Sequence, residues 1–246
     1  MKNIGDFMAT RIPSKLNNPK LVSVSFELRF EANEIYSDLV ALNLANALVL
    51  QGKGSLFQLP IMQLPPIARN SDPNLRYAPL FGVQMRNVVA QVGPRVLVVT
   101  VENYPGWAVF HPVIKEVLNC TASLRKKTER IGFRTINFFE DQDIENNLIT
   151  TVQNGLELPK VSCNFSLVYK DGDCQARYSF SNDAKMSKNG LPEQKGSFVD
   201  VDSFFEGNPS NIDATVNQLH DLGKKVFFES LKQEFVDTMG PVYGNN

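Results

Sequence analysis

The segment from Gln91 to Phe139 limits what this chain can fold into more than any other. It contains the run Val96–Val101, which is rich in β-branched residues, and these fit a pleated sheet because their restricted χ1 costs little there. Four consecutive apolar residues predict a central strand that is covered on both faces. Pro105-Gly106 predicts a tight turn, and the apolar residues that follow recur at helical spacing. We therefore expect a strand, an aromatic turn, a helix and a second strand.

Two other segments alternate apolar and polar residues, as half-buried strands do. Val22–Phe30 is one, and residues 161–180 form the clearest hairpin, with Asp171-Gly172 as the expected two-residue turn. That turn places Cys174 opposite Tyr169 and Cys163 opposite Phe180. The two thiols are then too far apart for a disulfide.

Helical periodicity appears at Ile35–Leu50 and again in a long terminal helix that is expected to open near Ser210 and to end at Gly240-Pro241. Strands outnumber helices and hairpins are frequent. The pattern predicts an α+β fold with a mostly antiparallel, curved sheet, helices packed on one face and a long C-terminal helix. We expect one domain over residues 19–240, with a junction between two αβ halves near 140–160 as an alternative, a loose arm over 1–18 and a tail over 241–246.

Two local features follow from the second half of the central segment. The apolar residues change face between Phe133 and Ile136, which predicts a bulge or a change of covering layer near Arg134-Thr135. The acidic residues between 140 and 145 are expected to open a helix, since negative charge is favourable at a helix N-terminus.

The composition of the chain limits which classes of function are expected. The chain has 246 residues, 25 basic and 26 acidic side chains and a net charge of −1, which does not steer the whole molecule toward nucleic acid or a membrane. Three cysteines at irregular spacing indicate reduced thiols and a cytoplasmic location. The N-terminal segment lacks the apolar stretch of a secretory signal, and no apolar run approaches the roughly 20 residues of a membrane helix.

Tyr104 and Trp107 are the first candidate binding residues. A turn that presents two large aromatic side chains can anchor a partner protein, because such residues dominate interface hot spots. The same pair can instead fold back onto the start of the following helix, since aromatic rings bury much apolar area. We expect burial.

Arg130 and Arg134 are the next candidates, within a basic cluster that begins at Arg125. The acidic run at 140–145 cancels much of its field, and no nucleic-acid signature accompanies it. His220 is the last candidate, expected to hydrogen-bond a neighbouring strand. No nucleophile accompanies either histidine, so we assign no catalytic residue. Asp200 and Asp202 share a strand face, but without further ligands they predict an arginine-paired or solvated face rather than a metal site.

Several motifs together resemble those of one family. They are Asn18-Pro19, Val24–Phe30, Asn74–Tyr77, Gln91–Leu97, Tyr104-Pro-Gly-Trp107, Arg130–Asn137, Val199–Asp202 and Leu219-His-Asp221. The chain is similar in these motifs to a sporadically distributed bacterial and archaeal family of uncharacterised proteins of about this length. The resemblance implies a single αβ domain and brings no activity, cofactor or site residue.

Two functional hypotheses remain. The first is a non-enzymatic protein-interaction module that binds another protein or itself, with a chaperone-like role or a place in a bacterial defence or toxin–antitoxin system, as the family's sporadic distribution suggests. The alternative is a small-molecule or lipid binder with an apolar cavity gripped by a helix. An internal cavity of several hundred Å³ favours the second hypothesis, whereas a solid core with an exposed apolar groove favours the first. An enzyme ranks third, and no cofactor is expected.

Overall fold

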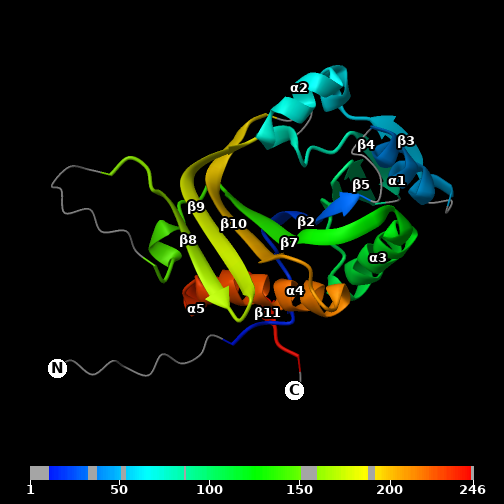
Figure 1. Cartoon of the computed structure of the whole chain (residues 1–246). Coiled ribbons are helices and arrows are strands. Elements are labelled where there is room, and N and C mark those ends of the chain that lie inside the picture. Colours follow the sequence, from blue (N-terminus) through cyan, green and yellow to red (C-terminus); the bar gives the residue numbers. More distant parts are fainter. Residues whose placement is uncertain are drawn as a thin grey trace.

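A nine-stranded antiparallel sheet organises the molecule (Figure 1). The computed structural model describes residues 11–32, 38–50, 54–85, 87–150, 160–187 and 192–244. The strand order is β3-β4-β5-β6-β2-β7-β10-β9-β8, so β3 and β8 are the edges and the sheet is open. Its strands are β2 (Leu21–Ala32), β3 (Ser55–Gln58), β4 (Phe81–Met85), β5 (Val88–Gly93), β6 (Val96–Val101), β7 (Arg125–Glu140), β8 (Asn164–Asp171), β9 (Cys174–Met186) and β10 (Gln194–Glu206). The predicted α+β class with an antiparallel sheet is confirmed.

Helices cover one face of this sheet. The helices are α1 (Asp38–Leu50), α2 (Pro66–Ser71), α3 (Trp107–Cys120), α4 (Ile212–Glu229) and α5 (Gln233–Thr238), and four short 3₁₀ turns join them. The α1 helix packs on β3, β4 and β5, and α4 packs on β7, β9 and β10. Alternate residues of the strands point toward the helices, as Phe26 and Leu28 of β2 do, and both are completely buried. Among the described residues, no helix is both long and apolar enough to cross a membrane.

The long terminal helix α4 is present, but Asn211 rather than Ser210 caps it, and it ends at Glu229 instead of continuing to Gly240-Pro241. The separate helix α5 covers Gln233–Thr238. The Asn211 side chain accepts a hydrogen bond from the Ala214 backbone N–H, as an N-cap side chain typically does. Leu219 and Phe227 lie on the buried face of α4.

Two short segments from opposite parts of the chain also pair. Strand β1 (Lys15–Leu16), in the segment expected to be a loose arm, pairs with β11 (Pro241–Val242), in the segment expected to be a tail. Residues 1–10 of the expected arm lie outside the described residues.

The turn of the β8–β9 hairpin differs from the prediction by one residue. Asp171 pairs with Cys174, so Gly172 and Asp173 form the turn, and Phe165 rather than Cys163 lies opposite Phe180. Gly172 has a φ of +57°, and only glycine adopts this conformation without steric cost, so the glycine takes the first central position. The shift moves each cross-strand partner by two positions, so the predicted inner and outer faces survive. The cysteines are free.

The structure tests two predictions around β7. The strand pairs with β10 without interruption from Arg130 to Glu140, so β7 itself has no bulge at Arg134-Thr135. Its pairing with β2 does shift register just beyond, between Ile136–Ser23 and Asn137–Leu21, where the extra residue lies on β2. The other alternative, a change of covering layer, agrees with the burial of both Phe138 and Phe139, which point to opposite faces. After β7, the acidic segment opens no α-helix and forms only the 3₁₀ turn Glu145–Asn147. The Asp143 side chain accepts a hydrogen bond from the Glu145 N–H, a local bond that competes with helix formation.

Candidate functional site: a pocket between the sheet and helix α4

The five candidate residues divide between the two faces of the sheet. Tyr104, Trp107 and His220 come together on the face that the helices cover. Arg130 and Arg134 point to the opposite face, because they alternate with Phe133, which faces the helices. The sequence identified both groups but not their separation.

Trp107 lies where the aromatic turn meets helix α4. Gly106 has a φ of +93°, and this conformation reverses the chain so that Trp107 begins α3. The indole ring stacks between two imidazoles, with its centroid 4.7 Å from that of His111 and 4.1 Å from that of His220. Its Nε1–H donates a hydrogen bond of 3.1 Å to Asn217 Oδ1. The indole is half-buried and locks α3 against α4.

A charged group supports this stack from the α4 side. His111 Nε2 lies 2.8 Å from Asp213 Oδ1, and Lys115 donates to the other carboxylate oxygen at 3.3 Å. Burial opposes the ionisation of Asp213, but its hydrogen bonds to Lys115 and His111 outweigh burial and lower its pKa. His111 is therefore held in place and has a structural role.

Tyr104 packs against the first turn of the same helix. Its ring meets the Phe110 ring edge-on, with 5.9 Å between centroids. Its hydroxyl is buried and has no hydrogen-bond partner among the described residues. Burial raises the pKa of Tyr104, so the hydroxyl stays protonated and can donate a hydrogen bond.

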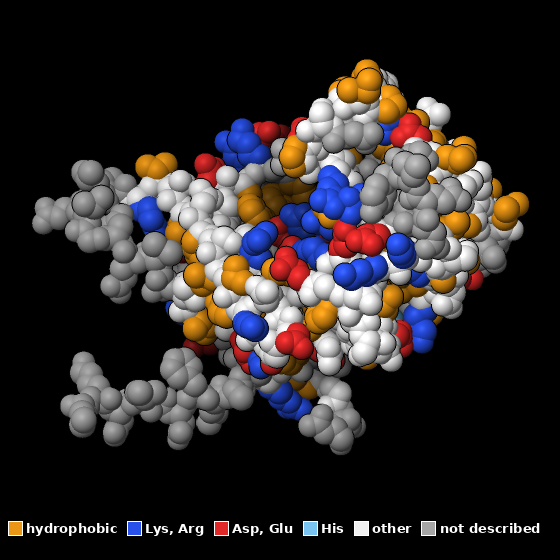
Figure 2. All heavy atoms as spheres, viewed as in Figure 1, with side chains coloured by type: hydrophobic (Ala, Val, Ile, Leu, Met, Phe, Trp, Pro, Cys, Tyr) orange, Lys and Arg blue, Asp and Glu red, His pale blue; other side chains and the backbone are white. Residues whose placement is uncertain are grey.

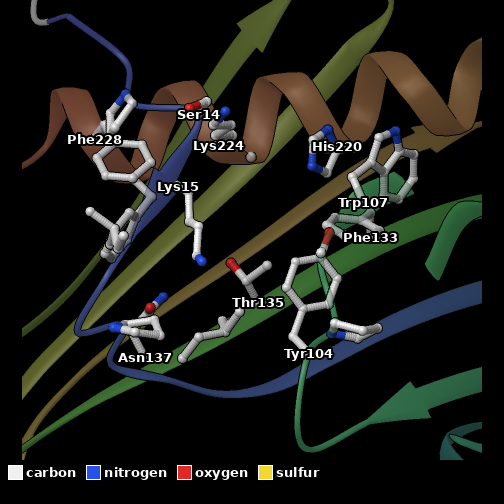
Figure 3. Close-up of a pocket in the computed structure, with 18 of the residues that line it drawn as sticks. Ser14, Lys15, Tyr104, Trp107, Phe133, Thr135, Asn137, His220, Lys224 and Phe228 are labelled. Atoms are coloured by element: carbon white, nitrogen blue, oxygen red, sulfur yellow. The ribbon is translucent and has the colours of Figure 1, made fainter. Parts of the chain in front are cut away.

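A pocket of about 590 Å³ lies between α4, the aromatic turn, strand β7 and the β1–β11 pair (Figure 3). We call it the helix-side pocket. Most of its wall is apolar, formed by Leu16, Leu21, Trp107, Phe133, Phe227 and Phe228. The polar or charged lining residues are Ser14, Lys15, Glu102, Asn103, Tyr104, Thr135, Asn137, His220 and Lys224.

Asn137 stands out among these polar residues because it lacks a hydrogen-bond partner in the described chain. It is 5% exposed and lines the pocket from β7. Among the residues that the structure describes, no side-chain hydrogen bond of Asn137 is formed. A fully buried polar group that lacks a partner costs about 1–3 kcal/mol, and the Tyr104 hydroxyl is such a group. The Asn137 amide faces the same pocket and is unpaired within the described chain, but its polar atoms are open to the pocket rather than fully buried.

Two basic residues of the pocket, Lys224 and His220, are partly desolvated. Burial lowers the pKa of Lys224, with Asp221 opposing the shift. Burial also lowers the pKa of His220, again against Asp221, whose Oδ1 lies 2.9 Å from His220 Nδ1. His220 therefore contacts its helical neighbour Asp221 and the Trp107 ring rather than a strand backbone, and its Nε2 edge forms no hydrogen bond within the described chain.

The opposite face carries a self-contained ion-pair network. We call Glu27, Arg130, Arg134, Asp200 and Asp202 the charged face. Arg130 bonds Glu27 at 2.7 Å and Asp202 at 2.8 Å, and its guanidinium lies 4.8 Å from the centre of the Phe204 ring. Arg134 makes a two-point contact with Asp200, at 2.8 and 2.6 Å. Figure 2 shows acidic and basic side chains interspersed around a hollow on one face of the molecule.

These ion pairs occupy the carboxylates that could bind a metal and the guanidinium groups that could bind nucleic acid. The carboxylates of Asp200 and Asp202 are occupied by arginines, and no group of three or more metal-ligating side chains occurs in the described part of the chain. The basic cluster is divided as well, because the Arg125 guanidinium bonds the Leu118 carbonyl at the end of α3 at 2.6 Å.

The sequence missed Lys15, Asn137 and Lys224. Lys15 and Lys224 come from opposite ends of the chain, and Asn137 is one polar residue within a strand. The one available signal was that Asn137 points to the same face as Phe133, where a polar side chain is unexpected. Neither a scan against models of known protein families nor a search of the curated proteins finds a match to this chain. The family resemblance of the motifs therefore remains a prediction.

Proposed function

We propose that this protein binds a small, largely apolar molecule in the helix-side pocket. The observation that carries the proposal is the buried, unsatisfied Tyr104 hydroxyl in the wall of a largely apolar pocket, with the unpaired Asn137 amide facing the same space. A ligand that accepts a hydrogen bond from the Tyr104 hydroxyl would remove its desolvation penalty, and Asn137 offers a second polar contact. A volume of about 590 Å³ lies within the range of roughly 300–1,000 Å³ that small-molecule sites occupy.

The pocket also favours the ligand-binding hypothesis over the protein-interaction hypothesis. The two aromatic residues that could anchor a partner, Tyr104 and Trp107, instead line the pocket and pack against the core. A few polar groups converging in an apolar concavity are typical of ligand sites. The roles as a chaperone-like or defence-system component remain predictions.

Trp107 provides the readout for a direct test, because it is the single tryptophan and forms part of the wall. The protein is titrated with the neutral dye Nile red, and both the dye emission and energy transfer from Trp107 are recorded. We expect saturable binding of one dye molecule per chain.

Two leucine variants locate the site. Thr135→Leu places a larger side chain in the pocket and should abolish dye binding. Thr100→Leu is the matched control, because Thr100 lies on the other face of the sheet. It pairs with Ser25 of β2, which is on the same face as Glu27. The proposal fails if wild-type protein shows no saturable binding, or if Thr135→Leu binds the dye as well as Thr100→Leu does.

A further inference from the structure

We infer that the ligand of the helix-side pocket is an organic anion with a carboxylate group, and that this group ties the N-terminal segment to α4 and β7. The inference rests on the proposed function and names its ligand class. We call Pro13–Leu16 the strap. The strap lines the pocket and carries Lys15, whose side chain extends into the pocket toward Thr135 and Asn137 in Figure 3.

The charges around the pocket favour a single negative group. Lys15 and Lys224 line it from the strap and from α4, and within the described chain neither ammonium group has an ion-pair or hydrogen-bond partner. Glu102 is the one acidic residue of the lining. Asp221 acts on Lys224 from outside the lining, so the attraction for an anion comes from two ammonium groups that lack ion-pair partners rather than from an excess of positive charge. A ligand carboxylate would provide that partner where burial has already removed part of the hydration of Lys224.

The neutral polar groups fit the same ligand. A carboxylate accepts several hydrogen bonds. The Asn137 amide and the Thr135 hydroxyl can both donate, and they lie on the same face of β7, two residues apart. The aromatic rings of Trp107 and Phe133 form another part of the wall and would contact an apolar body. The expected ligand class is therefore an alkyl or aryl carboxylic acid of a size that the pocket encloses.

The strap is held by a short ladder with β11, the pairs Lys15–Val242 and Leu16–Pro241. The Ser14 N–H and hydroxyl add two hydrogen bonds, both to the Val242 carbonyl at 2.8 Å. Beyond the ladder, the Asn17 and Asn18 amides donate to the carbonyls of Gly240 and Met239, each at 3.0 Å. So short a ladder opens readily. A carboxylate that bridges Lys15 to α4 would hold it closed, and the ligand would then leave the pocket only when the strap opens.

The first experiment compares acids with neutral molecules of the same shape. A series of alkyl and aryl carboxylates and their primary amides is titrated against the full-length protein by calorimetry and Trp107 fluorescence. We expect at least one acid to bind at least ten times more tightly than its amide. Lys15→Met and Lys224→Met should each reduce this preference several-fold and leave amide binding unchanged. Lys195→Met, at an exposed position of β10, is the control.

The outcomes separate the two proposals. If acids and amides both bind but with equal affinity, or if the preference survives both lysine substitutions, the carboxylate inference is wrong while the binding function stands. If neither acids, amides nor Nile red bind, the proposed function itself fails.

Hydrogen exchange tests the strap. With a saturating acid, exchange of the Asn17 and Asn18 amides should slow at least ten-fold, and the matched amide ligand should slow it much less. Lys15→Met should abolish the difference. Equal exchange in the free and acid-bound protein would overturn the closing role of the strap.

Discussion

The two faces of the sheet handle polar groups in opposite ways. On the charged face, Arg130 and Arg134 are each bound to acidic residues of neighbouring strands. In the helix-side pocket, the Tyr104 hydroxyl is buried without a partner in the described chain, and the Asn137 amide faces the pocket unpaired. The charged residues of the other face bind one another, so their density does not indicate a ligand site. The proposed binding site is the pocket, where polar groups without partners meet an apolar wall.

The largest expected effect concerns apolar packing on the helix side. Phe227 is 6% exposed and meets the ring of Phe228 edge-on, with 5.1 Å between centroids. Phe227→Ala should lower the free energy of unfolding by about 3–5 kcal/mol, as measured by urea denaturation, because it empties a core aromatic site. Phe227→Leu, which keeps most of the volume, should lose less than half as much. An unchanged midpoint in Phe227→Ala would mean that the ring contributes nothing to the core.

The next effect concerns the charged face. Arg130→Met leaves Asp202, which is 22% exposed, without its bonded cation, whereas Glu27, 26% exposed, keeps its 2.8 Å ion pair with Arg29. Removing one partner of a buried pair costs about 3–5 kcal/mol, and partial exposure reduces this to about 2–3 kcal/mol. Arg134 is 50% exposed, so Arg134→Met should cost at most about 1 kcal/mol. Nile red binding should stay unchanged in both variants. A loss of binding in either variant would contradict the separation of the two faces.

The sequence predicted the secondary structure better than the site, for a physical reason. Alternation and β-branched runs report local burial, so β2, β6 and the β8–β9 hairpin were recognisable from a few residues each. The helix-side pocket is not local, because Lys15, Asn137 and Lys224 meet only after β1 pairs with β11 and α4 packs on β7. Arg130 and Arg134 stood out because charge is visible in a sequence, whereas the acidic partners that neutralise them come from other strands.

Trp107 gives an intermediate effect, because it is half-buried and its contacts join α3 to α4. Trp107→Ala should cost about 2 kcal/mol, less than the 3–5 kcal/mol of a fully buried aromatic residue. Asn217→Ala removes the acceptor of the indole N–H and the donor to the Asp213 carbonyl, and should cost about 1–2 kcal/mol. In the native wild type, Trp107 emission should be blue-shifted relative to the unfolded chain and partly shielded from acrylamide. Emission as red and as readily quenched as in the unfolded chain would contradict this packing.

The smallest expected change in stability compares the two faces directly, because one tyrosine hydroxyl is removed from each. Tyr77 donates a 2.7 Å hydrogen bond from its hydroxyl to Glu129, beside the charged face, whereas the Tyr104 hydroxyl has no partner in the described structure. Tyr77→Phe should lower the free energy of unfolding by about 1 kcal/mol, because a charge-assisted hydrogen bond is lost. Tyr104→Phe should raise it by up to about 1 kcal/mol, because the phenyl ring no longer buries an unsatisfied hydroxyl.

The same Tyr104→Phe variant should bind the preferred acid several-fold more weakly, since the hydroxyl that destabilises the free protein would donate to the ligand. A gain in stability together with a loss of affinity is the mark of a residue kept for binding rather than for folding. If Tyr104→Phe instead destabilised the free protein as much as Tyr77→Phe does, the Tyr104 hydroxyl would be satisfied within the fold, and one of the two groups that argue for a ligand would be lost.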